Sequence, residues 1–287
     1  MDFFILGAGP PYKGKQHSAL QAVSNSELVL DWSLRAVKRL NPSCNFVCGY
    51  QAEIIQARYP ELDYIYNKDW ESSRAGWSLL TSLTNTSEDS LVSYSDILFH
   101  ETIVKSLMET DGDVVVAVDS QWHSRYVGRN LEDIKRCEKV CVVEKVITRL
   151  GADIQISQAN AEFVGLVRFS KKAIEHLSKL KKLSNFDNNN LKQANLSDLI
   201  ELLRLQGLKV IAAEVHGDWS QLNEPADLAR FILGTKAQTL SRLKQMVTLS
   251  RIEDQFTFNV DQWNKEPLQS INKVQKTLGK GRLIIRS

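Results

Sequence analysis

Short hydrophobic runs bounded by turn residues alternate with stretches of helical periodicity through the first two-thirds of the chain. This alternation is typical of a mainly parallel sheet that is covered by helices on both faces. We therefore predict an α/β protein. Strands are predicted in 3–6, 45–48, 63–67, 90–99, 113–118, 140–150, 163–169 and 210–215, and helices in 30–40, 75–83 and 196–205.

The run 113–118 is the stretch richest in β-branched residues. Strands that are buried on both faces lose the alternation of polar and apolar residues, so this run is predicted to lie in the middle of the sheet. Asp119 follows it and is expected to end the strand. The run 90–99 is interrupted by a polar stretch at 94–96, which contains Asp96.

The pattern changes near Pro225. Residues 227–249 have the periodicity of one long helix, weakly interrupted at Gly234. Residues 256–260 and 282–286 read as strands without obvious partners, and a natural chain rarely stops inside a strand. We therefore expect a piece of a longer protein, with one domain in 1–235 and a helical linker with a truncated lead-in to a further domain in 236–287.

Composition narrows the class of protein. A chain of 287 residues with 43% hydrophobic and 24% charged residues is typical of a globular protein. The 36 Lys and Arg residues nearly balance 34 Asp and Glu residues, which argues against a nucleic-acid binder and favours a small-molecule partner. A run long enough to span a membrane and a signal peptide are both missing, so we predict a cytoplasmic protein without membrane contact.

The cysteines form two pairs in sequence, Cys44 with Cys48 and Cys137 with Cys141. Metal ligands and disulfides are alternatives for such spacing, but each pair lies in or beside an apolar run, and metal clusters more often use tighter pairs. Buried reduced thiols are therefore the favoured interpretation.

The first candidate for chemistry is the turn 7–11 after the first strand. Glycines let backbone N–H groups approach a phosphate, and open sheets bind ligands at the carboxyl ends of their strands, although an ordinary turn explains the residues equally well. The chain contains neither a dinucleotide-binding glycine motif nor a P-loop. Lys13, Lys15 and His17 follow and can place positive charge near a triphosphate, with a solvated loop as the alternative.

Two acidic stretches are further candidates. Asp96 lies between apolar residues at a strand end, where an acid is costly unless a cation or donor compensates it, so a site for Mg²⁺ is predicted. A helix N-cap before the stretch that starts near His100 is the alternative. In 218–228, Pro225 suits a first helical position and Asn223 or Glu224 the cap, so structure alone can explain that stretch.

Together these stretches resemble the sugar-phosphate nucleotidyltransferase family over roughly residues 3–233. Residues 5–9 match its opening strand and Gly-rich loop, and 17–20 match its Pro-Lys-Ala-Leu element. Its first-helix signature is similar to 29–34, and the acid of its Gly-Asp-hydrophobic element falls on Asp96. Residues 144–146 and 161–166 are similar to the acceptor-side segments, and 223–228 to the closing Asp-x-x-x-Asp-Leu element.

The resemblance implies a three-layer, Rossmann-like nucleotidyltransferase fold with a mainly parallel, mixed sheet. It also implies transfer of a nucleoside monophosphate, with CMP favoured, from an NTP to a small phosphorylated or phosphonate acceptor, with Mg²⁺ bound and pyrophosphate released. The expected residues fall into four groups. They are Lys13, Lys15 and Asp96 for catalysis; Leu6, Gly7, Ala8, Gly9, Ser18, Ser78 and Asp96 for the nucleotide; Asp119, Arg125, Glu144, Lys145 and Glu162 for the acceptor; and Asp96, Asn223 and Asp227 for the metal.

Two positions depart from the family pattern. Ser18 stands where the family usually has Lys, and Asn223 where it usually has the second metal-binding Asp. A neutral amide oxygen is a weaker ligand than a carboxylate, so metal affinity should be lower. Lys13 or Lys15 is expected to supply the missing cation.

Residues 256–260 and 283–287 are similar to the start of the ATP-grasp domain in phosphoenolpyruvate synthase-like proteins. This second resemblance implies a bifunctional parent protein, in which an attached kinase makes a phosphorylated metabolite used in surface-polysaccharide decoration. The alternative function is a catalytically silent nucleotide-binding module that regulates or scaffolds the kinase. Pyrophosphate release in the presence of NTP and acceptor distinguishes the two.

Overall fold

The computed structural model describes residues 1–12, 14–83, 88–126, 129, 131–183, 188–223, 225–234, 237, 239–240, 244, 248–258, 260–279 and 281–283. The chain divides into two compact units, Met1–Phe231 and Ile232–Ser287. All the candidate site residues of the sequence analysis belong to the first unit.

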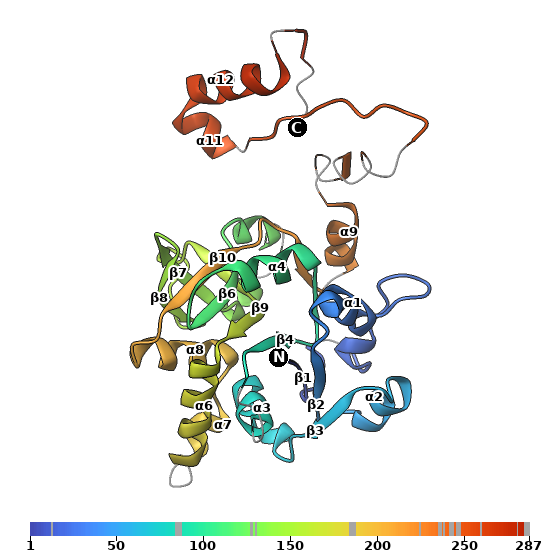
Figure 1. Ribbon diagram of the computed structural model, residues 1–287, viewed down its shortest axis with the longest axis vertical. Coiled ribbons are helices and arrows are strands. Elements are labelled where there is room, and N and C mark those ends of the chain that lie inside the picture. The colour runs from blue at the N-terminus through green and yellow to red at the C-terminus, as the bar shows by residue number, and fades with distance from the viewer. Residues whose placement is uncertain are drawn as a thin grey trace. The chain divides into compact units, whose positions relative to one another are not determined.

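A nine-stranded sheet, counted over the described residues, forms the middle of the first unit (Figure 1). Its order is β3-β2-β1-β4-β9-β6-β10-β8-β7. The pairs β3–β2, β2–β1, β1–β4 and β6–β10 are parallel, whereas β9 runs antiparallel to both β4 and β6. The strands are β1 (Asp2–Gly7), β2 (Ser43–Cys48), β3 (Asp63–Tyr66), β4 (Ser90–Tyr94), β6 (Val114–Asp119), β7 (Lys139–Val143), β8 (Val146–Gly151), β9 (Ala161–Phe169) and β10 (Val210–Glu214).

Alternate residues of each strand point to opposite faces of the sheet, and β1 shows how this builds the layers. Phe4 and Leu6 pack in a core with α3 (Ala75–Ser82), α6 (Lys171–Leu183) and α8 (Leu196–Leu205). Phe3 and Ile5 pack in a second core with α1 (Val29–Val37), α2 (Ala52–Arg58) and α4 (Glu101–Glu109). The predicted α/β class with helices on both faces is therefore confirmed.

The predicted strand directions and the predicted strand 140–150 need correction. The sheet is mixed, as expected, but parallel pairing is confined to the two blocks β3-β2-β1-β4 and β6-β10. Residues 140–150 form a hairpin, because Glu144 and Lys145, with φ of 49° and 70°, connect β7 to β8. Positive φ at both central residues is the requirement of a two-residue hairpin turn of type I′.

A short two-stranded ladder beside the main sheet determines where the candidate site lies. The strand β5 (Ile97–Phe99) pairs antiparallel with β11 (Trp219–Gln221), so that Ile97 lies opposite Gln221. The backbone N–H of Leu222 also donates to the carbonyl of Asp96 at 3.3 Å. Segments more than 100 residues apart in sequence are thereby held side by side.

The end of the chain differs from the prediction. The helix α9 covers Pro225–Leu233, and it ends before Gly234, whose φ of 64° lies in the left-handed region. The predicted continuous helix 227–249 is therefore wrong, and 248–250 are not helical. In the second unit the described helices are α11 (Val260–Lys265) and α12 (Pro267–Leu278).

The strands predicted in 256–260 and 282–286 are also not confirmed. Residues 256–258 have no regular structure and Val260 begins α11, while 281–283 are not in a strand. Residues 284–287 lie outside the described part. The strand pattern on which the ATP-grasp resemblance depended is therefore missing from the described residues of this region.

Two further predictions concern the cysteines and membrane-spanning helices. Cys48 and Cys137 are buried, whereas Cys44 and Cys141 are partly exposed, so the prediction of four buried thiols holds for one member of each pair. Among the described residues, the helices are too short or too polar for any of them to cross a membrane.

Candidate active site

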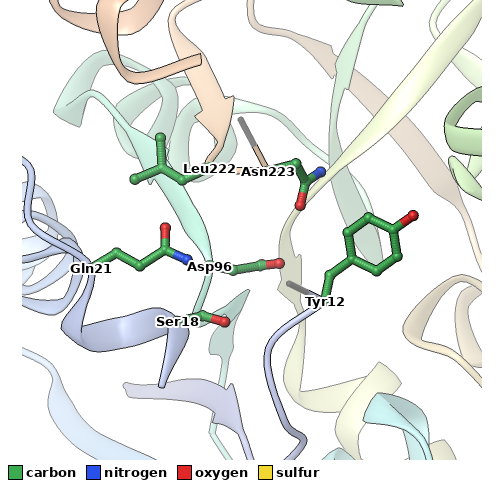
Figure 2. Close-up of a pocket in the computed structure, with 6 residues that line it drawn as sticks. All are labelled: Tyr12, Ser18, Gln21, Asp96, Leu222 and Asn223. Carbon is green, nitrogen blue, oxygen red and sulfur yellow. The ribbon is translucent and has the colours of Figure 1, made fainter. Parts of the chain in front are cut away.

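A small pocket lies beside the opening loop of the first unit (Figure 2). Its volume is about 60 Å³. Asp96 points into it from the turn between β4 and β5, and Asn223 points into it from the segment after β11. The residues that line it are Tyr12, Ser18, Gln21, Asp96, Leu222 and Asn223. Three of the predicted site residues, Ser18, Asp96 and Asn223, are thus brought together.

Asp96 is held in place by the β5–β11 ladder. Its Oδ2 accepts a hydrogen bond of 2.8 Å from Nε2 of Gln221, which is at the end of β11. Burial raises the pKa of the Asp96 carboxyl above its ordinary value, and the hydrogen bond from Gln221 opposes this rise. A desolvated carboxylate of this kind gains from a cation at the pocket. The alternative of a helix N-cap is not confirmed, because the N-cap of α4 is His100.

Asp227 does not belong to the pocket. Its side chain is 1% exposed and forms a salt bridge with Arg129, and its Oδ2 accepts from the backbone N–H of Asn223 at 3.1 Å. Both carboxylate oxygens therefore have partners at the start of α9. These contacts neutralise its charge and give it a structural place, so the assignment of Asp227 to the metal stays a prediction without support from the described contacts. Asn223 is the residue of this element that faces Asp96.

The glycine loop after β1 has a packing role at its first position. A Cβ atom on Gly7 would lie 2.3 Å from Cζ of Phe46, so this position requires glycine for close approach of β2. Leu6 and Ala8 are buried, and their carbonyls accept from Ser95 and Tyr50. Gly9 is exposed and has open space around its Cα. Of the four residues of this loop that were predicted to bind the nucleotide, Gly9 is therefore the one that a ligand can approach freely.

His17 has a structural position, contrary to the expectation of a positive loop. It is 1% exposed; its Nδ1 accepts from the N–H of Ala19 at 3.1 Å, so Nε2 carries the proton and donates to the carbonyl of Gly7 at 2.7 Å. Burial lowers the pKa of the imidazole, although the bond to Gly7 opposes this. A neutral His17 therefore ties the glycine loop to the 3-10 helix η1 (Ser18–Leu20).

The described structure does not bring Lys15 into the pocket. Lys15 is exposed, and its carbonyl accepts hydrogen bonds from the side chains of Tyr50 and Gln51 at 2.8 and 3.1 Å. It is not among the described residues that line the pocket. Lys13 lies outside the described residues. The catalytic assignment of both lysines stays a prediction.

The neutral His17 predicts a specific pH dependence of stability. A pKa that is lower in the folded state than the unfolded value of about 6.5 means that the unfolded chain binds the proton first. The stabilisation is present above that value and is lost as the pH falls to the lowered folded pKa. We expect the free energy of unfolding, measured in urea, to fall less between pH 7.5 and 5.5 in His17→Gln than in the unchanged protein. His123→Gln, at an exposed histidine, is the control variant.

The predicted acceptor residues Asp119, Arg125 and Glu162 form one buried network. Glu162 accepts from Nη1 of Arg125 at 3.1 Å, and the Arg125 guanidinium lies 3.7 Å from the ring centroid of Trp219. Asp119 accepts from Nε1 of Trp219 and from the N–H of Gln121, both at 2.9 Å. These contacts satisfy the charges of Asp119 and Arg125 inside the protein. Glu162 lines a second pocket, which is described below.

The remaining predicted site residues lie elsewhere. Glu144 and Lys145 are exposed at the tip of the β7–β8 hairpin and line neither pocket, so their resemblance to acceptor-side residues reflects a turn. Ser78 is buried in α3, where its hydroxyl accepts from Nδ2 of Asn67 at 3.0 Å. A nucleotide-binding role for Ser78 is not supported, because its environment is internal.

Sequence reasoning missed Tyr12, Gln21, Leu222 and Gln221. Gln21 directly follows the Ser18-Ala19-Leu20 element, and Leu222 and Gln221 directly precede Asn223. Their closeness in sequence to a predicted residue is the only signal that these three carried. Tyr12 lies between the glycine turn and Lys13. Nothing in residue type distinguished it from a solvated loop residue.

The oxygen atoms at the pocket fit a Mg²⁺ ion. Asp96 supplies a carboxylate, Asn223 an amide oxygen and Ser18 a hydroxyl, and the side chains of all three line the pocket (Figure 2). Mg²⁺ is usually bound by one or two carboxylates, and its other ligands are waters and substrate phosphates. Within the described residues no cluster of three or more His, Cys, Asp or Glu side chains could hold a metal ion by itself. The fit therefore depends on ligands from a phosphorylated substrate.

Comparison with known proteins finds similarity over most of the chain. The chain is 20% identical over 248 residues to the CTP:phosphoglutamine cytidylyltransferase of Campylobacter jejuni subsp. jejuni serotype O:2, with 79% of this chain and 98% of the relative covered. The structure resembles the inositol-1-phosphate CTP transferase from T. maritima with a TM-score of 0.61 and 19% identity, over 86% of this chain and 97% of that one.

The structure also resembles the CTP:phosphocholine cytidylyltransferase from Streptococcus pneumoniae, with a TM-score of 0.55, 13% identity and coverage of 80% and 96%. No family model matches the sequence. The chain therefore has the α/β fold, with a mixed sheet, that these nucleotidyltransferases share, and it resembles a cytidylyltransferase over most of its length.

Proposed function

We propose that this protein is a nucleotidyltransferase that transfers CMP from CTP to a small phosphorylated acceptor. The observation that carries the proposal is the pocket in which Asp96 and Asn223 lie close to the opening glycine loop (Figure 2). The fold supports it, and so do the names of the similar proteins, because each name contains CTP and a phosphorylated compound.

The proposed reaction is a displacement at phosphorus. An oxygen of the acceptor phosphate forms a bond to the α-phosphorus of CTP, the bond from that phosphorus to the bridging oxygen breaks, and pyrophosphate leaves with the electron pair. The protein has little covalent chemistry to do, so its contribution is to position the two phosphates and neutralise their charge. The open backbone around Gly9 gives the triphosphate access to the carboxyl end of β1.

Asp96 and Asn223 are the residues that would hold Mg²⁺, with Ser18 beside them. A bound Mg²⁺ supplies neutralisation of charge on the nucleotide phosphates. Gln221 keeps the Asp96 carboxylate directed to the pocket through its hydrogen bond. Because the described lining supplies one carboxylate and neutral oxygens, the affinity of the site for Mg²⁺ should depend strongly on the nucleotide.

The Asn at position 223 leads to a prediction. In Asn223→Asp a second carboxylate faces Asp96, and its added charge should lower the Mg²⁺ concentration for half-maximal activity about tenfold. The measurement is initial rate against Mg²⁺ at saturating CTP. Asn190→Asp, at an exposed position of α7 (Asn188–Lys192), is the control and should leave the Mg²⁺ dependence unchanged. An unchanged Mg²⁺ dependence in Asn223→Asp would remove this residue from the metal site.

The proposed function is tested by pyrophosphate release with each of the four NTPs and a panel of phosphorylated acceptors. The expected result is release that requires Mg²⁺ and an acceptor and is fastest with CTP. Equal release with the four NTPs would contradict the assignment of CTP. Nucleotide binding without release would favour the silent nucleotide-binding module instead. Cleavage of a nucleotide other than CTP would keep the reaction class and change the donor.

The attached ATP-grasp kinase and the link to surface polysaccharides stay predictions. A kinase joined to this enzyme would deliver a phosphorylated product to the acceptor site, which is the chemical reason for the association. Mass spectrometry of the full-length gene product tests it, because a kinase domain adds a large mass after the present sequence.

A further inference from the structure

A second pocket lies next to the first, and Gln221 connects the two. Gln221 lines the second pocket, and its Nε2 donates to Asp96, which lines the first. The second pocket is formed mainly by β9, β11, the end of α5 (Leu131–Arg136) and the two residues that follow it, Cys137 and Glu138. An acceptor seated there can reach a nucleotide held beside Asp96.

A cation lies on the side where the two pockets meet. The Arg136 guanidinium lies 4.6 Å from the ring centroid of Tyr12, which lines the first pocket, while Arg136 itself lines the second. Within the described part of the chain, Arg136 has no carboxylate partner. Guanidinium groups bind phosphate with paired hydrogen bonds, so this position suits the phosphate end of an acceptor.

The second pocket also contains a carboxylate without a cation. Glu138 accepts from the Tyr94 hydroxyl at 2.8 Å and from the N–H of Ser197 at 3.2 Å, and among the described residues it has no basic partner. Glu162, by contrast, is neutralised by Arg125. Burial raises the pKa of Glu138, which indicates that its negative charge is incompletely compensated in the protein alone.

Aromatic side chains complete this part of the lining. Phe163 and Trp219 line the pocket together with Glu138, and the Tyr94 ring lies 6.1 Å from the Phe163 ring, centroid to centroid. A carboxylate with aromatic neighbours is favourable for an ammonium group, through charge and through cation–π attraction. A purely neutral ligand would leave Glu138 without compensation.

We infer that the acceptor is a phosphorylated amine, with its phosphate at Arg136 and its ammonium group at Glu138. The inference rests on the proposed function and names the substrate class of the acceptor site. Binding energy from the ammonium end would fix the phosphate in the orientation that the displacement at phosphorus requires.

Isosteric ligand pairs test the inference by direct binding. Calorimetry is carried out with Mg²⁺ and a CTP analogue whose α–β bridge is methylene, so no turnover is needed. Phosphocholine is compared with 3,3-dimethylbutyl phosphate, and phosphoethanolamine with propyl phosphate. We expect the ammonium member of at least one pair to bind about tenfold more tightly. Equal affinity within both pairs, or binding of none of the four, overturns the inference.

Variants assign the preference to residues. Glu138→Gln should abolish the preference for ammonium, whereas Glu144→Gln, at the exposed hairpin tip, should retain it. Arg136→Met should weaken all four ligands about tenfold, and Arg149→Met, at an exposed arginine, should not. A preference that survives Glu138→Gln contradicts the role of Glu138. Failure of the proposed function would be seen in a different measurement, as absence of pyrophosphate release with every acceptor. The affinities are measured without turnover, so they do not depend on that result.

Discussion

Asp96→Asn should lower kcat for pyrophosphate release about a thousand-fold. The variant keeps the shape of the side chain and one oxygen, but it removes the carboxylate that, among the described residues, lines the pocket beside Asn223 and Ser18. Loss of a bound metal forfeits several kcal/mol of transition-state charge stabilisation, and each 1.36 kcal/mol is a factor of ten in rate. The measurement is steady-state turnover with saturating CTP and acceptor over a range of Mg²⁺ concentrations.

Asp153→Asn is the matched control, because Asp153 is exposed and pairs with Arg149 on the surface. It should change kcat by less than about twofold, since surface ion pairs contribute little. Folding of Asp96→Asn is checked by urea denaturation. The variant should be at least as stable as the unchanged protein, because it removes a desolvated charge whose pKa burial raises. Full activity in a folded Asp96→Asn protein would exclude a metal at this carboxylate.

Arg125→Met should reduce the free energy of unfolding by about 3–5 kcal/mol. The two side chains of the Arg125–Glu162 pair are only 7% and 4% exposed, and their atoms approach to 3.1 Å. Removal of the guanidinium leaves Glu162 buried with the Tyr126 hydroxyl as a hydrogen-bond donor, at 2.6 Å. Urea denaturation followed by tryptophan fluorescence and by circular dichroism measures the loss.

The double variant Arg125→Met with Glu162→Gln shows whether the cost comes from the uncompensated charge. It should recover more than half of the stability lost in Arg125→Met, because a neutral amide replaces the unpaired carboxylate. Arg149→Met, at an exposed pair, should cost less than about 1 kcal/mol. No recovery in the double variant would mean that packing of Arg125 on Trp219, and not charge, dominates.

The strands of the main sheet were predictable because each is a short apolar run. β1, β2, β6 and β10 lie within a residue or two of their predicted ranges, and β6 is buried throughout. Strand direction was less accessible, because a run such as β9 has the same pattern in either direction. The β7–β8 hairpin was missed for a related reason, since Glu144-Lys145 lacks the glycine or asparagine that usually marks such a turn.

The candidate site was predictable where a polar residue interrupts an apolar run. Asp96 stood out in this way, and the structure places it in the pocket with Ser18 and Asn223. For the other acidic residues, the hydrogen-bond and salt-bridge partners come from segments that are distant in sequence. Asp227 pairs with Arg129, 98 residues away, and Glu214 accepts from the N–H of Ser120, so sequence spacing did not show which acids were already satisfied.

Burial of single polar residues was the other source of error. His17 lies between polar residues and was expected to be charged, yet its ring is enclosed beside Gly7 and Ala19. Gly7 was expected to contact phosphate, yet the Phe46 ring occupies the space next to it. Both outcomes depend on how β2 and η1 pack against the loop. The hydrophobic periodicity of the sequence does not predict this packing.

The central claim is that Asp96 and Asn223 bind a divalent cation together with CTP. Its most direct test is a crystal structure with Mn²⁺ and a CTP analogue whose α–β bridge is methylene, in which anomalous scattering locates the metal. We predict a metal peak about 2 Å from an Asp96 carboxylate oxygen and in contact with the nucleotide phosphates. A nucleotide bound with its metal away from Asp96 would contradict it.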